Sequence, residues 1–101
     1  MNQKAMMRQI QQMQAEMARA QEELAVLEVT GQAGNGLVTA TCTAAGEWRG
    51  LTIDPKLLDP EDPDMVQDLV LAALNDAKAQ AEAAQQQRLG PLTSGMNLPG
   101  F

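Results

Sequence analysis

Residues 29–54, which read VTGQAGNGLVTATCTAAGEWRGLTID, decide the fold. Asn35-Gly36 is a strong signal for a two-residue hairpin turn, and Ala45-Gly46 permits a second turn of the same kind. The segments between and beside the two turns are rich in Thr and Val, which favour strands. We therefore expect a three-stranded antiparallel meander, in which each strand pairs with the next along the chain.

The two turns also set the register of the meander. They pair Cys42 with Val29 in the first hairpin and with Arg49 in the second. Both hairpins then carry their apolar residues on the same face, and a slip of one residue in either would scramble it. The apolar face holds Val29, Val38, Ala40, Cys42, Leu51 and Ile53, and the opposite face holds Thr39, Thr41, Thr43, Thr52 and Trp48. We expect a helix to cover the apolar face and the exposed sheet edges to invite a second subunit.

Residues 1–28 predict one long helix with a coiled-coil seam. Apolar side chains recur at alternating spacings of four and three, and no Gly or Pro interrupts them. Such a helix would be about 40 Å long, whereas a compact domain of this size has a radius of gyration of about 13 Å. The helix must therefore project or lie along a partner. The seam consists of Met6, Ile10, Met13, Met17, Ala20, Leu24 and Leu27.

A second long helix is predicted from about residue 60 to residue 88. Either Asp59-Pro60 or Asp62-Pro63 could supply the N-cap and the first helical residue. The distal half of this helix is rich in Ala and Gln and buries little, so we expect it to project as well. Gly and Pro recur in residues 89–101, which predicts an extended or disordered tail. The single domain is thus expected to span residues 1–88.

The core of this chain is sparse for its length. Among 101 residues, 45% are counted as hydrophobic, but 16 of these are Ala and 7 are Met. Because each buried methylene contributes only about 0.8 kcal/mol, so small a set of large apolar groups makes a monomer marginal. An oligomer is therefore expected.

Composition also excludes several function classes. The chain has no His and one Cys, so the usual acid/base group and most metal sites are missing, and no internal disulfide can form. No apolar run approaches the roughly 18 residues of a membrane span, and no secretory signal pattern opens the chain. No nucleophile–base pair is visible. We expect a cytoplasmic protein with no catalytic residues, no metal and no cofactor.

The formal net charge of −6 is unevenly spread. Residues 54–68 hold six acidic groups and one Lys, a local charge of −5, while the other 86 residues sum to −1. Residues 1–21 carry three basic side chains against one acidic one, which gives +2. The negative total charge argues against a nucleic-acid partner, but the first predicted helix is mildly basic.

Four features have a structural and a functional interpretation. The glycines of residues 31–36 are better explained by turn chemistry than by phosphate binding, since they join strand to strand. The carboxylates of residues 54–68 fit helix capping better than a metal site. Cys42 is expected to be a small buried hydrophobe rather than a reactive thiol. Trp48 is expected in sheet or interface packing, with stacking on a base as the alternative.

With these features in place, the sequence resembles the bacterial YbaB/EbfC nucleoid-associated proteins over nearly its whole length. The resemblance is carried by Gln11-Gln12-Met13-Gln14, Leu27-Glu28-Val29-Thr30-Gly31, Gly34-x-Gly36-Leu37-Val38, Ile53-Asp54-Pro55-x-Leu57-Leu58, Asp68-Leu69-Val70-x-Ala72-Ala73-x-Asn75-Asp76-Ala77 and Ser94-Gly95-Met96-x-Leu98-Pro99. It implies a tweezer-like homodimer of α+β fold in the cytoplasm, associated with the nucleoid. Its partner would be double-stranded DNA, held by the two long helices.

The resemblance maps DNA contacts onto Lys4, Arg8, Arg19, Lys78 and Arg88. The seam and the sheet predict dimer contacts at Met13, Met17, Leu24, Leu27, Val38 and Trp48. Because phosphate contacts carry little sequence information, we expect weak specificity and an affinity that falls steeply with salt. The alternative is an acidic coiled-coil adaptor whose Met-rich seam binds another protein, such as one of replication or recombination.

Overall fold

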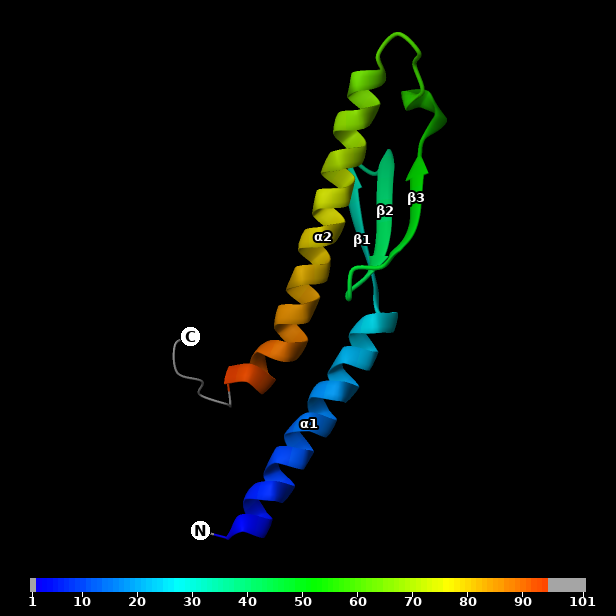
Figure 1. The fold of residues 1–101 in the computed structure, drawn as a ribbon. Coiled ribbons are helices and arrows are strands. Elements are labelled where there is room, and N and C mark those ends of the chain that lie inside the picture. The colour runs from blue at the N-terminus through cyan, green and yellow to red at the C-terminus, as the bar shows by residue number, and fades with distance from the viewer. Residues whose placement is uncertain (1, 95–101) are drawn as a thin grey trace.

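The structure is a computed structural model that describes residues 2–94. In chain order the elements are α1 (Gln3–Val26), β1 (Glu28–Ala33), β2 (Val38–Thr43), β3 (Trp48–Ile53), the short 3-10 helix η1 (Pro55–Leu57) and α2 (Pro63–Ser94). The three strands form one antiparallel sheet in the order β1-β2-β3 (Figure 1). This arrangement of helix, meander and helix confirms the predicted α+β fold.

Helix α2 packs directly on the face of β1 and β2 (Figure 1). Ala73, Ala77 and Ala81 recur at every fourth position and are buried against the sheet. A Cβ atom on Gly31 would overlap the backbone of Ala73 and Ala77, so only glycine lets helix and strand approach this closely. The core under α2 is correspondingly thin, and its other buried members are Val38, Ala40, Cys42 and Leu57.

The β2–β3 turn is one residue longer than the sequence predicts. The Thr43 N–H donates to the Glu47 carbonyl at 2.8 Å, which leaves residues 44–46 in the loop instead of two residues. Gly46 adopts a φ of +100°, the conformation that such three-residue loops need at their last position. The longer loop shifts the pairing at the turn, and a β-bulge beside Cys42 restores the predicted register further along.

This bulge corrects the predicted position of Trp48. Cys42 lies opposite Trp48 and not opposite Arg49, which is the extra residue. Trp48 therefore lies on the face that α2 covers, where it lines a hollow together with Cys42 and Lys78. Its side chain remains 51% exposed because α2 lies over the other two strands.

Helix α1 leaves the sheet and projects from it (Figure 1). Only its carboxyl-terminal half packs in the chain, where Ala20 and Leu24 are buried, while Met6 and Ile10 are about half exposed. The carbonyl of Leu24 accepts the N–H of Ala45 at 3.2 Å, which anchors this helix end on the β2–β3 turn. The molecule measures 71 × 27 × 16 Å, with a radius of gyration of 19.6 Å, as the length of the predicted helix requires.

The start of α2 agrees with one of the two predicted caps, whereas its end lies beyond the predicted one. Its start matches the second predicted cap, since the Asp62 carboxylate accepts the Met65 N–H at 3.3 Å and Pro63 is the first helical residue. Its end does not match, because the helix continues beyond residue 88 through Pro91 to Ser94. Proline lacks one N–H but has helical φ, so the last turns bend without unwinding (Figure 1). Residues 95–101 of the predicted tail lie outside the described part of the chain.

Candidate nucleic-acid interface

Three of the predicted cations share one face of α1. Successive residues of a helix are rotated by about 100°, so Lys4, Arg8 and Arg19 fall within an arc of about 60°. Along the axis, Lys4 and Arg19 are about 22 Å apart, which corresponds to roughly six base pairs of duplex DNA. We call these three residues the basic face of α1.

The basic face lies opposite the apolar seam of the same helix. By the same rotation, Met13 and Met17 are about 150–200° away from it around the helix axis. Both methionines are half-buried, whereas all three residues of the basic face are exposed. Helix α1 thus separates an apolar side, suited to packing, from a cationic side, suited to a solvated polyanion.

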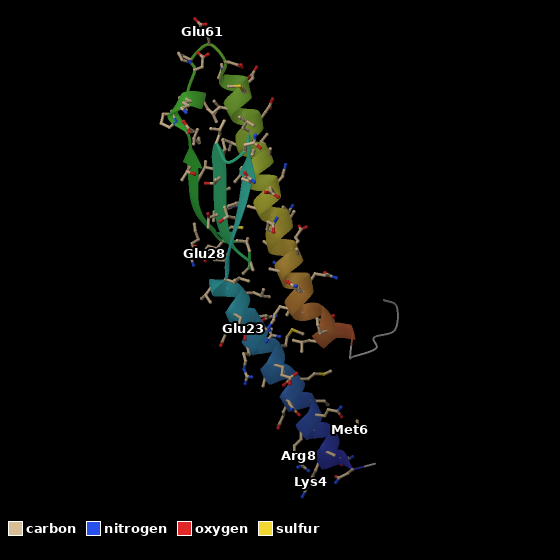
Figure 2. All side chains as sticks on the ribbon, turned by 180° about the vertical axis from the view of Figure 1, so that it is seen from behind. Lys4, Met6, Arg8, Glu23, Glu28 and Glu61 are labelled. Atoms are coloured by element: carbon tan, nitrogen blue, oxygen red, sulfur yellow. The ribbon has the colours of Figure 1, made fainter. Side chains whose placement is uncertain are left out.

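The basic face is available for a ligand. Within residues 2–94, none of its three side chains forms a salt bridge. Lys4 and Arg8 line a shallow hollow near the amino end of α1, and the polar side chains of Gln3 and Gln11 extend it. The backbone N–H of Lys4 donates to the Asn2 side chain at 3.0 Å, which caps the helix start. Figure 2 shows Lys4 and Arg8 at the free end of the helix.

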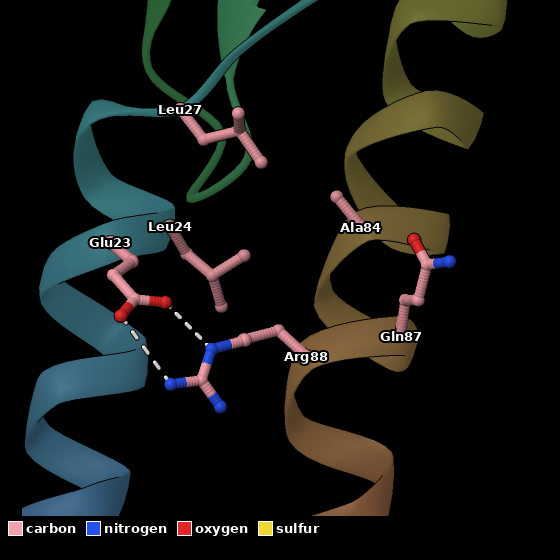
Figure 3. A pocket seen from close by; sticks show the side chains of 6 residues that line it. All are labelled: Glu23, Leu24, Leu27, Ala84, Gln87 and Arg88. Atoms are coloured by element: carbon pink, nitrogen blue, oxygen red, sulfur yellow. Dashed lines mark hydrogen bonds and ion pairs between the residues drawn. The ribbon is translucent and has the colours of Figure 1, made fainter.

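Arg88 is engaged inside the molecule. Its Nε donates to Glu23 Oε2 at 2.6 Å and its Nη2 donates to Glu23 Oε1 at 3.4 Å, which ties α2 to α1 (Figure 3). The hydrogen bond from Arg88 lowers the pKa of Glu23, and the charges of Arg88 and Arg19 lower it further against a partial desolvation. The same bond raises the pKa of Arg88. Arg88 therefore acts first as a link between the two helices.

Lys78 is placed apart from the basic face. It lies on α2 beside Trp48, in a hollow that Glu82 also lines one helical turn further on. A carboxylate at the i+4 position offsets the field of Lys78, as Glu23 does in part for Arg19 on α1. The structure therefore brings Lys4, Arg8 and Arg19 together and leaves Lys78 and Arg88 elsewhere.

Some residues predicted for a dimer interface are buried in the single chain and others are exposed. Val38 is fully buried within the single chain and Leu24 is 4% exposed, so neither has surface to lose to a partner. Val38 and Leu24 therefore offer almost no accessible surface in the single chain. Leu27 and Trp48 are about half exposed and remain accessible, as does Leu51, which the sequence places in the covered core.

No sequence pattern indicates the link between Glu23 and Arg88. The two residues are 65 positions apart, and no local spacing connects them. The same is true of Asp76, whose carboxylate accepts the Gln32 N–H of edge strand β1 at 2.9 Å. Both are long-range contacts that depend on how α2 crosses the sheet.

The described residues contain no membrane-crossing helix and no metal-ligand cluster. Neither helix within residues 2–94 has the length and apolar character needed to cross a bilayer. In the same part of the chain, no three acidic or Cys side chains come together as metal ligands.

A projecting helix with a cationic side is suited to contact an extended anion. Comparison with known proteins identifies the family. The model of the YbaB/EbfC DNA-binding family matches residues 1–96. The chain belongs to this family.

Relatives and a solved structure agree with this assignment. The chain is 53% identical over 103 residues to a nucleoid-associated protein of Streptomyces avermitilis, covering 99% of this chain and 91% of that protein. It is 55% identical over 93 residues to one of Nocardia farcinica, covering 92% and 84%. The crystal structure of an uncharacterized protein from Helicobacter pylori matches with a TM-score of 0.77 at 25% identity, over 92% of this chain and 98% of that one.

Proposed function

We propose that the protein binds duplex DNA as a homodimer and that the basic face of α1 makes the contacts. The observation that carries this proposal is the placement of Lys4, Arg8 and Arg19 on one exposed arc of a projecting helix. Family membership supports DNA as the ligand. The contacts are ionic contacts to phosphates, which position the protein on DNA without reading its sequence.

The half-exposed apolar residues support the homodimer. Met13 and Met17 are half-buried in the single chain and lie on the seam between its exposed amino end and the buried Leu24, and Leu27 lies at the carboxyl end of the seam. Trp48 and Leu51 add a second apolar area on edge strand β3. Pairing of two chains through the seam and this edge covers both areas and leaves the basic face of each α1 outward.

Weak sequence preference follows from phosphate contacts and fits a protein spread over the nucleoid. Two basic faces supply six cations per dimer. Since each neutralised phosphate contributes about −0.9 to the log–log slope of affinity against salt, we expect a slope of about −5. The slope should be nearly the same for two duplexes of unrelated sequence.

Fluorescence anisotropy with a labelled duplex across a salt series tests this proposal. Arg8→Gln removes two contacts per dimer and should make the slope less negative by about 2. Lys56→Gln removes an equal charge near the opposite end of the molecule and should leave the slope unchanged. Binding that does not respond to salt, or equal loss in both variants, would contradict the proposal.

A further inference from the structure

The end of the molecule opposite the α1 amino terminus carries exposed apolar side chains. Leu58 is 61% exposed and Met65 is 40% exposed. Leu58, Pro60, Pro63 and Val66 line a shallow hollow of about 590 Å³. We call this region, residues 58–66, the tip (Figure 2 labels its Glu61).

Four carboxylates belong to the same segment as this apolar hollow. Asp59, Glu61, Asp62 and Asp64 lie in the tip, and Asp59 also lines the hollow. Two of them cap backbone: Asp59 accepts the Glu61 N–H at 2.9 Å and Asp62 accepts the Met65 N–H at 3.3 Å. Capping accounts for these two acids, but it does not explain large apolar side chains held in water between them.

The amino end of α1 has the complementary character. Met7 is 58% exposed and Lys4 and Arg8 flank it on the helix surface, whereas Met6 belongs to the seam of the proposed homodimer. This end is therefore apolar with a basic border, as the tip is apolar with an acidic border. Figure 2 shows Lys4, Met6 and Arg8 at one end of the molecule and Glu61 at the other.

We propose that the tip of one copy binds the amino end of α1 of another copy, with Met7 over the apolar hollow and Lys4 and Arg8 facing the carboxylates. The two ends of one chain cannot meet, because the molecule is 71 Å long and they lie at opposite ends of it. Complementary charge and exposed apolar area together identify a second copy of this chain as the occupant.

This contact joins two different surfaces, so a pair of chains keeps one free tip and one free α1 end. Such heterologous contacts do not close on themselves unless a rotation brings the ends together, so they build open assemblies. The ion pairs lie at the border of the contact, where salt screens them. Association therefore grows with protein concentration at low salt and reverses at high salt. It is independent of DNA, although it uses two cations of the proposed DNA interface.

Sedimentation velocity of the full chain without DNA tests the contact. At about 20 mM salt the mean mass should rise with protein concentration beyond that of a dimer, and at about 500 mM salt it should not. Glu61→Lys with Asp64→Lys should abolish this rise, as should Lys4→Glu with Arg8→Glu. Glu22→Lys with Glu28→Lys is the control for the tip variant. It makes the same change in net charge as Glu61→Lys with Asp64→Lys, but away from the tip, and it should leave the rise in mass intact.

Mixing the two charge-reversed proteins provides the decisive measurement. Glu61→Lys with Asp64→Lys takes the charge of residues 58–66 from −4 to 0, so this tip no longer attracts Lys4 and Arg8. Lys4→Glu with Arg8→Glu instead sets acidic side chains against an acidic tip. In the mixture, the unmodified α1 end of the first variant meets the unmodified tip of the second, and the introduced lysines can face the introduced glutamates. The mixture should therefore regain the rise in mass that neither variant shows, which misfolded proteins would not do. A mass that stays constant at low salt for the unmodified chain, or a mixture that fails to associate, would overturn the contact. Because no DNA is present, either result leaves the DNA proposal intact.

Discussion

At the scale of single residues, backbone packing at one glycine and one ion pair hold the two halves of the molecule together. Gly31 lets α2 lie against β1, because any side chain there would overlap the backbone of Ala73 and Ala77. Arg88 and Glu23 join the helices below the sheet, where few large apolar side chains are buried. Removing either feature weakens the packing of α2 against the rest of the chain, and loss of the exposed ion pair has the smaller effect.

Gly31→Ala should destabilise the protein. The added methyl group forces α2 away from β1, and overpacking of this kind typically costs about 1–3 kcal/mol. Urea denaturation measures the change as a lower midpoint. Gly50→Ala is the matched control, because a Cβ atom there has open space within 4 Å. Equal midpoints for the two variants would contradict the close packing of α2 on β1.

The Glu23–Arg88 pair should make stability depend on acid pH. Its hydrogen bond lowers the pKa of Glu23 in the folded state below 4.5, so its stabilisation is present above about pH 4.5 and is lost as pH falls through the lowered pKa. The urea midpoint of Glu23→Gln should therefore lie below that of the unmodified chain near neutral pH, and the gap should narrow in acid. The effect is small, because the pair is exposed.

Glu22→Gln is the control for this experiment. Glu22 is the exposed neighbour of Glu23 on α1, and it forms no salt bridge within residues 2–94. The gap between its midpoint and that of the unmodified chain should not follow the same pH course. A Glu23→Gln gap that is constant from about pH 7 to about pH 3 would refute the role of the pair.

At the scale of elements, the sequence predicts the helices, the strands and the pairing of adjacent strands. It does not predict contacts between elements that are distant along the chain. Alternation and the Asn35-Gly36 turn specified the β1–β2 register, and it is confirmed. The β2–β3 turn was mispredicted by one residue because Ala44 and Ala45 donate N–H groups to carbonyls of Leu27 and Leu24, contacts with the preceding helix region that no local pattern contains. The predicted face of Trp48 is wrong because the longer turn and its bulge move this residue to the opposite face of the sheet.

The candidate site likewise contains a part that the sequence predicts and a part that it does not. Helical spacing alone places Lys4, Arg8 and Arg19 on one face, so that group could be read from the sequence. The pairing of Arg88 with Glu23 could not, because it depends on the angle at which α2 crosses the sheet and passes α1.

The α1 seam should hold two chains together. Met13→Glu with Met17→Glu places charges in the proposed homodimer contact, where burial without a partner is unfavourable, and should yield a monomer by sedimentation equilibrium. Gln14→Glu with Ala18→Glu adds the same charge outside the seam and should preserve the dimer. Dissociation in both variants, or in neither, would place the contact elsewhere.

At the scale of the whole molecule, charge is separated along the long axis. The amino end of α1 is basic and the tip is acidic, at opposite ends of a body 71 Å long. The field of DNA attracts one end and repels the other. We therefore expect the separation of charge along the molecule to orient the protein on DNA, whereas the net charge of −6 lowers the affinity.

This orientation can be measured with a DNA-cleaving iron chelate attached to an introduced cysteine. Cys42 is 1% exposed, so a surface cysteine should react selectively. With DNA in excess, a chelate at Ala15→Cys, on the basic face, should cut the duplex, and one at Glu61→Cys, at the tip, should not. Comparable cutting from both positions would show that the molecule does not bind by its α1 end.

The alanine contact between α2 and the sheet also has a thermal consequence. Unfolding a compact domain of about 100 residues raises the heat capacity by about 1.2–1.5 kcal/mol/K, mainly through newly hydrated apolar surface. Here the buried side chains are mostly Ala, in a body only 16 Å thick, so each chain hydrates less such surface. We expect calorimetry to give a smaller heat-capacity change per chain. The free energy of unfolding would then curve only gently with temperature, and the fold would resist cold as well as moderate warmth.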